Sequence, residues 1–204
     1  MNFPKRGLYA ITQTENKSDT QILNEVEQII LGGAVALQYR DKRQNKSIKL
    51  AEQLLTLCRQ YAIPLIINDD IKLAQDINAD GVHLGKEDGT VLQAREILGD
   101  NTIIGVSCYN NLETALHAEQ QGVNYVAFGR FFSSSTKPLA NPADIRTLIK
   151  AKQLLTVPIV AIGGILPSNA ELLLNAGADL LAVIGGLYTE HPKESAKAYS
   201  CLFQ

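Results

Sequence analysis

The amino-acid sequence predicts one α/β domain, a (β/α)8 TIM barrel, that spans residues 1–204. Short apolar runs alternate with amphipathic stretches, eight such pairs can be counted, and polar residues follow nearly every apolar run. With 46% hydrophobic and 20% charged residues, the chain can bury one sizeable core without dividing further. A doubly wound open sheet is the structural alternative. We rank it lower because a closed barrel gathers polar strand ends at one mouth.

The predicted strands are rich in Val, Ile, Leu and Tyr, and their nearly continuous apolar character is typical of strands buried on both faces. They span residues 7–11, 35–39, 64–68, 81–84, 102–106, 125–128, 158–162 and 180–184. The predicted helices span residues 19–31, 46–61, 71–77, 89–98, 111–121, 142–155, 168–175 and 191–202. Gly32, Gly33 and Gly122 stand where helices should end, because glycine readily takes a left-handed C-cap conformation.

Composition argues against several classes of function. The 19 basic and 21 acidic side chains nearly cancel, and no run of Lys or Arg suggests a nucleic-acid binder. No apolar stretch approaches the ~18 residues of a membrane span, and no apolar segment follows the basic opening residues. Cys58, Cys108 and Cys201 are too few and too scattered for a disulfide framework or a zinc site. We expect a soluble, cytoplasmic protein without nucleic-acid or membrane partners, and the sequence leaves monomer and homo-oligomer open.

The second predicted strand ends in a charged run. Strand alternation places Gln38, Arg40 and Lys42 on one side, so that two cations and an amide face the mouth together. A solvated charge run is the alternative, and on this run alone it would be preferred.

Acidic residues follow the next two predicted strands. Asp69 and Asp88 could together hold one Mg²⁺, with phosphate oxygens completing the ligand shell. Helix capping is the alternative for Asp70 and Asp88, because each precedes a helical pattern. His83 lies within an apolar strand, and we interpret it as a hydrogen-bonded structural histidine because no second His or Cys stands at ligand spacing.

The later strand ends offer hydroxyl groups and glycines. Ser107 and Cys108 close the fifth strand, with no histidine base nearby in sequence to activate either as a nucleophile. Residues 128–138 form a hydroxyl-rich loop that ends in a lysine and could close over a polyphosphate. Glycine pairs at 163–164 and 185–186 follow the seventh and eighth strands, where TIM barrels bind phosphate through backbone N–H groups. One such pair would be an ordinary tight turn, but two favour a phosphate site.

Together these motifs resemble the thiamine phosphate synthase family over essentially the whole chain. The matches are LYAIT at 8–12, QYRDK at 38–42, IIND at 66–69, GVHLG at 81–85 with Asp88, IIGVS at 103–107, STK at 135–137 and AIGGI at 161–165. The resemblance implies a transferase that joins 4-amino-5-hydroxymethyl-2-methylpyrimidine diphosphate to 4-methyl-5-(2-phosphooxyethyl)thiazole. The products would be thiamine phosphate and pyrophosphate, with Mg²⁺ on the leaving group.

The resemblance also implies residue roles. Arg40, Lys42 and Lys137 would hold pyrophosphate with Asn68 beside it, while Asp69 and Asp88 would take Mg²⁺. Gln38 and Ser107 would lie by the pyrimidine, and the catalytic set would be Arg40, Lys42, Ser107 and Lys137. The thiazole phosphate would be lined by Ser134, Thr136, Gly164, Ile184 and Gly185. The chain departs from the family pattern at three positions, where Lys86, Ser134 and Gly185 stand in place of Gln, Thr and Ser.

The residues also indicate how such a reaction would run. Arg, Lys and Mg²⁺ would neutralise the departing pyrophosphate, and the electron-rich pyrimidine would stabilise the cation left at its methylene, which makes the substitution dissociative. A thiazole tautomerase of the same superfamily is the nearest rival, but it has no use for a diphosphate and metal site. A non-catalytic binder of thiamine phosphates is the other.

Overall fold

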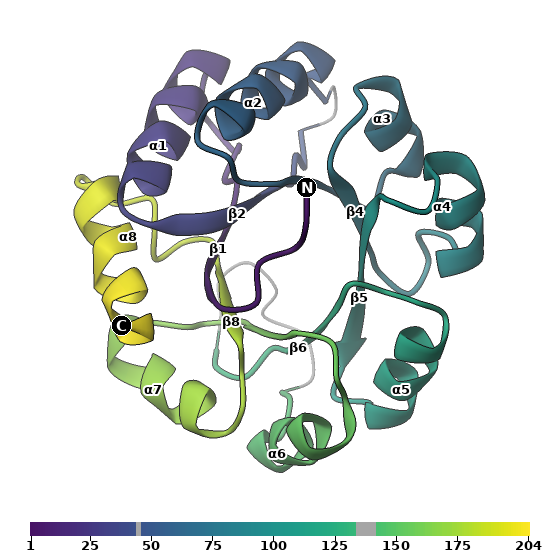
Figure 1. The fold of residues 1–204 in the computed structure, drawn as a ribbon. Helices are drawn as coiled ribbons and strands as arrows, with labels where there is room; N and C mark the ends of the chain where they lie inside the picture. The colour runs from purple at the N-terminus through teal and green to yellow at the C-terminus, as the bar shows by residue number, and fades with distance from the viewer. Residues whose placement is uncertain (44–45, 134–141) are drawn as a thin grey trace.

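The computed structural model describes residues 1–43, 46–133 and 142–204, and in this part of the chain eight parallel strands form a closed barrel in sequence order. The strands are β1 (Gly7–Ile11), β2 (Ala34–Tyr39), β3 (Leu65–Asn68), β4 (Gly81–Leu84), β5 (Ile103–Tyr109), β6 (Tyr125–Gly129), β7 (Ile159–Ile162) and β8 (Leu180–Val183). The helices are α1 (Asp19–Leu31), α2 (Ile48–Gln60), α3 (Ile71–Asp76), α4 (Val91–Leu98), α5 (Leu112–Gln120), α6 (Ile145–Leu154), α7 (Pro167–Asn175) and α8 (Pro192–Ser200), followed by the 3-10 helix η1 (Cys201–Phe203). Figure 1 shows the helices as an outer ring around the strands. The barrel prediction is confirmed, and pairing of β8 with β1 excludes the open-sheet alternative.

Polar residues in the loops decide where the helices begin. The side chains of Ser47, Asp70 and Thr90 each accept a hydrogen bond from a backbone N–H in the first turn of α2, α3 and α4. These caps explain why α2 and α4 begin two residues later than the sequence pattern predicts. Pro64 and Pro158 similarly fall just before β3 and β7, since proline has no N–H to give to a strand ladder.

The core has two layers. One lies between barrel and helices and includes Val26, Leu54 and Leu148, all fully buried. The other fills the barrel itself, where Phe3 stacks on Tyr125 with ring centroids 3.9 Å apart. The segment before β1 therefore crosses the centre of the barrel, as Figure 1 shows. It seals the amino ends of the strands, so the site lies at their carboxyl ends.

The cysteines behave as the sequence predicts, since all three are free thiols. Cys58 and Cys108 are buried, in α2 and β5, and Cys201 is exposed in η1. Across the three described stretches of the chain, the helices are all too short or too polar to span a membrane.

Candidate active site

A cavity of about 390 Å³ opens at the carboxyl ends of the strands. Ten of the predicted site residues line it: Gln38, Arg40, Lys42, Asn68, Asp69, Asp88, Ser107, Gly164, Ile184 and Gly185. Ser134, Thr136 and Lys137 lie outside the described residues, so their roles stay predictions. Lys86 is exposed, and it is not among the described residues that line the cavity.

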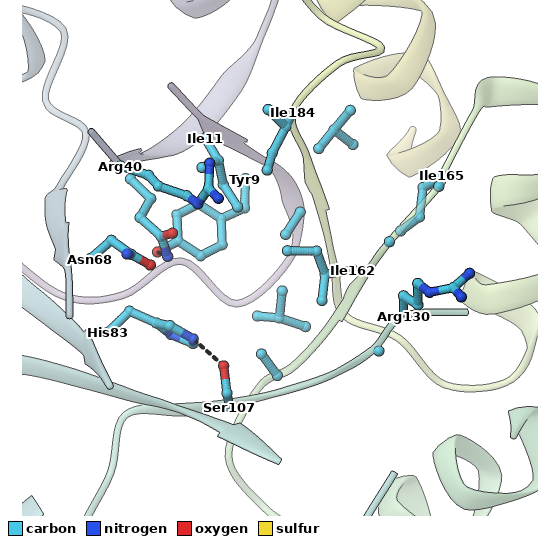
Figure 2. Close-up of a pocket in the computed structure, with 18 of the residues that line it drawn as sticks. Tyr9, Ile11, Arg40, Asn68, His83, Ser107, Arg130, Ile162, Ile165 and Ile184 are labelled. Atoms are coloured by element: carbon cyan, nitrogen blue, oxygen red, sulfur yellow. Dashed lines mark hydrogen bonds between the residues drawn. The ribbon is translucent and has the colours of Figure 1, made fainter. Parts of the chain in front are cut away.

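The cavity has a polar and an apolar side. In Figure 2, Arg40, Asn68, His83 and Ser107 lie on one side, and isoleucines of β7 and the turns after β7 and β8 lie on the other, together with Arg130. Those isoleucines are Ile162, Ile165 and Ile184. The arrangement offers one charged compartment and one that is mostly apolar but also contains Arg130.

The two cations of the polar side come from the end of β2. Thr12 fixes the backbone of Arg40 on both sides, because its hydroxyl donates to the Arg40 carbonyl at 2.9 Å and accepts from the Arg40 N–H at 2.8 Å. The Arg40 side chain is only 11% exposed, with Glu15 3.8 Å away. Lys42 is 48% exposed and its Nζ lies 3.5 Å from Asp69 Oδ2. An anion bound in the cavity would thus meet a largely buried guanidinium and a half-exposed ammonium group.

Asp41, between these cations, points the other way into the protein. Its carboxylate is fully buried and accepts hydrogen bonds from Thr14, Tyr39 and Arg43, the last at 2.7 Å. Arg43 also bonds Asp19 at 2.8 Å. Burial alone would raise the pKa of Asp41, but the hydrogen bonds from Arg43, Tyr39 and Thr14 hold it well below its usual range. This network anchors the loop that presents Arg40 and Lys42.

Asp69 and Asp88 form an acidic pair at the ends of β3 and β4. Asp69 has a left-handed backbone with φ of 64°, a costly conformation for a residue with a side chain. Asn68 Nδ2 donates to Asp69 Oδ2 at 2.6 Å, and the Gly85 N–H donates to Asp88 Oδ2 at 2.9 Å. Burial and then the hydrogen-bonded Asp69 carboxyl raise the pKa of Asp88, whereas Gly85 and Lys42 lower it.

This donor set fits Mg²⁺. Two oxygen-bearing side chains that repel each other as anions suit a hard cation, which keeps several ligands from water or substrate phosphates. In the described parts of the chain, no group of three or more His, Cys, Asp and Glu side chains could hold a metal, so the other ligands would come from outside this pair. The capping alternative applies to Asp70, which caps α3, but Thr90 caps α4 in place of Asp88.

Gly164 after β7 and Gly185 after β8 differ in whether the structure leaves room for a side chain. Gly164 has a φ of 63°, and a Cβ there would lie 2.3 Å from the Ser133 carbonyl oxygen. The sequence predicted a glycine that admits phosphate, and the structure adds that this glycine lets two loops pack. At Gly185 a Cβ would meet nothing within 4 Å, so a larger residue such as the family's usual Ser would fit.

Sequence reasoning missed several residues of the cavity. Tyr9 and Tyr109 line it without having been predicted to do so. Arg130 and Ser133 also line it, and they belong to the predicted loop at 128–138 but were given no role of their own. His83 has the hydrogen bonds that we predicted, but it also lines the cavity. Its Nε2 lies 2.8 Å from Ser107 Oγ, as Figure 2 shows, so the serine does have a histidine beside it in space.

The fold and the site define a class, the TIM-barrel enzymes that bind phosphorylated substrates at the carboxyl ends of their strands. The family model described as thiamine monophosphate synthase matches residues 8–187. The thiamine-phosphate synthase of Methylobacillus flagellatus is 50% identical over 203 residues, 98% of this chain and 96% of that protein. That of Methylococcus capsulatus is 50% identical over 188 residues, 91% of this chain and 84% of that protein. A solved structure of thiamine phosphate pyrophosphorylase from Pyrococcus furiosus superposes with a TM-score of 0.86 at 33% identity, covering 98% of this chain and 96% of that one. The chain belongs to the thiamine monophosphate synthase family.

Proposed function

We propose that this chain is a transferase that couples 4-amino-5-hydroxymethyl-2-methylpyrimidine diphosphate with 4-methyl-5-(2-phosphooxyethyl)thiazole to form thiamine phosphate and pyrophosphate. The observation that carries the proposal is the two-sided cavity, in which Arg40 and Asn68 lie opposite Ile162 and Ile165. Lys42 also lines this cavity. Both relatives compared above and the Pyrococcus furiosus protein carry names for this activity. The free cysteines suit the reducing cytoplasm, where we expect the enzyme to act.

Departure of pyrophosphate is the step that the polar side would assist. The C–O bond at the pyrimidine methylene breaks, and its electron pair leaves with the diphosphate oxygen. Arg40 and Lys42 would neutralise that oxygen, Asn68 would donate a hydrogen bond, and Lys137 would add a third cation. Because Arg40 and Asn68 are in place before the bond breaks, they would stabilise the charge-separated transition state more than the ground state.

Asp69 and Asp88 would hold Mg²⁺ in this proposal. When bound, the metal would offset negative charge on the diphosphate in concert with Arg40 and Lys42. Burial and then the neighbouring Asp69 carboxyl raise the pKa of Asp88, which supports the binding of a cation by this pair. The ends of β3 and β4 would thus supply the carboxylates that hold the metal.

The apolar side would hold the thiazole. Gly164, Ile184 and Gly185 would bind its phosphate through backbone N–H groups, with Ser134 and Thr136 supplying hydroxyls. The thiazole nitrogen then attacks the pyrimidine methylene within the same cavity, so no covalent enzyme intermediate is required. Ser107 has His83 as a neighbour, but the group behind His83 is the neutral Tyr125 hydroxyl, whereas serine nucleophiles use a carboxylate there.

The direct test is incubation with both substrates and Mg²⁺, followed by mass analysis for thiamine phosphate and an assay of released pyrophosphate. Arg40→Ala should reduce pyrophosphate release by orders of magnitude, with Arg59→Ala on the outer helix α2 as the matched control. Thiazole isomerisation without the pyrimidine substrate would favour the tautomerase, and binding without pyrophosphate release would favour the non-catalytic binder.

The dissociative character has its own test. A trifluoromethyl group in place of the pyrimidine methyl withdraws electrons and destabilises the methylene cation. Each ~1.4 kcal/mol of lost stabilisation slows the chemical step about tenfold. Single-turnover kinetics with the two pyrimidines measure the chemical step directly, so slow product release cannot hide a difference in its rate. Near-equal rates would rule out the dissociative route and favour concerted displacement.

A further inference from the structure

Five side chains from five different strands form a continuous hydrogen-bond chain through the barrel. Gln38 Nε2 lies 3.0 Å from Tyr9 Oη, which lies 2.9 Å from Tyr125 Oη. His83 Nδ1 lies 2.9 Å from the same Tyr125 oxygen, and His83 Nε2 lies 2.8 Å from Ser107 Oγ. Both ends of the chain, Gln38 and Ser107, line the cavity.

We propose that this chain runs in one direction, from the Gln38 amide as first donor to the Ser107 hydroxyl as last donor, and so fixes which polar groups the cavity offers to the pyrimidine. The proposal rests on the proposed function for the identity of that ligand. The direction itself follows from the ligand-free protein.

The direction follows from the number of protons on each group. A glutamine amide nitrogen can only donate, so Tyr9 accepts from Gln38 and passes its own proton to Tyr125. Tyr125 is fully buried, and the arrangement that leaves no proton unused has its hydroxyl donate to His83 Nδ1. His83 is then neutral with its proton on Nε2, which donates to Ser107. The serine proton is left to point into the cavity.

Burial keeps the two tyrosines protonated, as this chain requires. Tyr9 is 1% exposed and Tyr125 is not exposed at all. Burial raises the pKa of both phenols above the ordinary value, so each retains its single proton at neutral pH. Each tyrosine hydroxyl in this hydrogen-bond chain therefore donates one proton, and the donors can point in one of two opposite directions along the chain.

The direction determines what a ligand meets at Gln38. With one amide proton given to Tyr9, Gln38 still offers one N–H and its Oε1, side by side. That pair complements the exocyclic amino group and the adjacent ring nitrogen of an aminopyrimidine. In the reverse direction Oε1 would have to accept from Tyr9, and Ser107 would give its proton to His83. Tyr125 thus acts as a positioning residue, because it connects the Gln38 end with the Ser107 end and is not among the described residues that line the cavity.

Nitrogen NMR of the ligand-free protein tests the direction without any substrate. Histidine labelled with ¹⁵N distinguishes a protonated from a bare ring nitrogen in long-range ¹H–¹⁵N spectra. The protein has three histidines, of which His117 and His191 are exposed. The signal that disappears in His83→Asn is therefore assigned to His83. We expect protonated Nε2 and bare Nδ1 near neutral pH. Protonated Nδ1 would overturn the proposal, whether or not the coupling reaction occurs.

Kinetics of Tyr125→Phe test the positioning role. The variant keeps the ring that stacks on Phe3 and removes only the hydroxyl. We expect kcat/KM for the pyrimidine diphosphate to fall about tenfold or more, with the KM for the thiazole phosphate unchanged. Tyr61→Phe, which removes a hydroxyl bonded to Glu27 outside the barrel, is the matched control and should leave both unchanged.

If Tyr125→Phe does not fold, Tyr9→Phe tests the same hydrogen-bond chain at its other tyrosine. It should lower kcat/KM for the pyrimidine diphosphate similarly while His83 keeps its Nε2 proton, because Tyr125 still donates to Nδ1. Wild-type kinetics in a folded Tyr125→Phe or Tyr9→Phe protein would overturn the positioning role. An inactive wild-type protein with the expected tautomer would instead refute the proposed function and leave the direction supported.

Discussion

Asp88→Asn should stabilise the metal-free protein and at the same time abolish its response to Mg²⁺. The pKa of Asp88 is raised by burial and by Asp69, so the protonated carboxyl favours the folded state, and this contribution to stability is present at low pH. That contribution is lost as the pH rises through the folded-state pKa, and at neutral pH the wild-type protein bears the repulsion. Asparagine keeps the size and an oxygen that can accept the Gly85 N–H, and it removes the charge.

The magnitude follows from Coulomb's law with a discount for solvent. Two unit charges about 4 Å apart repel by roughly 4 kcal/mol at an effective dielectric constant of about 20. The Asp69 side chain is 29% exposed and Lys42 lies 3.5 Å from it, so most of this repulsion is screened. A net gain of about 1 kcal/mol remains for the substitution. In a chain of this size that corresponds to a rise in Tm of about 2–4 °C.

Thermal unfolding at neutral pH and low salt, in chelator and then over a Mg²⁺ titration, measures both effects. The wild-type Tm should rise with Mg²⁺, whereas Asp88→Asn should start higher, stay constant and show no coupling activity. Asp70→Asn is the control: burial alone would raise the pKa of Asp70, but the Leu73 N–H and Lys46 lower it, so loss of this charge should lower Tm and leave the Mg²⁺ response intact. An Asp88→Asn protein that is no more stable in chelator, or that still responds to Mg²⁺, would refute the reasoning.

Three further predictions concern single residues. In Gly85→Ala the Cβ would lie 2.5 Å from Asp88 Oδ2, so displacement of the carboxylate should weaken Mg²⁺ binding about tenfold in a calorimetric titration, and an unchanged affinity would contradict this. Gly185→Ser enters open space and adds a hydroxyl, so the KM for the thiazole phosphate should fall about 3- to 10-fold, whereas an equal or higher KM would argue against phosphate binding there. Asp41→Asn breaks the buried pair with Arg43 and should lower the free energy of unfolding by about 3 kcal/mol at neutral pH. Because the folded-state pKa of Asp41 is depressed, urea unfolding should show this difference shrinking as the pH falls below about 4, and a pH-independent difference would count against it.

Local sequence patterns were sufficient to predict the barrel and most of its rim. Apolar runs of strand length gave all eight strands, because each buries both faces and is followed by an amphipathic helix. Parallel strands bring their carboxyl ends to one edge, so polar residues at those ends could be assigned to one site. Arg40, Asp69 and Ser107 were found in this way, and all three line the cavity.

Contacts across the barrel could not be predicted, because nothing local records them. Tyr9 and Tyr125 are 116 residues apart, and each looks like an ordinary apolar residue of a buried strand. Closure of the barrel brings their hydroxyls together, and the neighbouring strands β4, β5 and β6 place His83 between Tyr125 and Ser107. Phe3 was missed for the same reason, since it precedes the first strand and its stacking partner lies in β6.

The aspartates at the strand ends show most directly what sequence leaves undecided. Asp41, Asp69, Asp70 and Asp88 all follow a strand and precede a helix. Asp41 and Asp70 meet Arg43, Lys46 and backbone N–H groups, which lower their pKa and make them stabilising. Asp88 meets another carboxylate, and Asp69 has a left-handed backbone besides, so this pair costs stability. Neighbours in space, which the closed barrel supplies, therefore separate the aspartates that hold the loops from the two that we expect to bind metal.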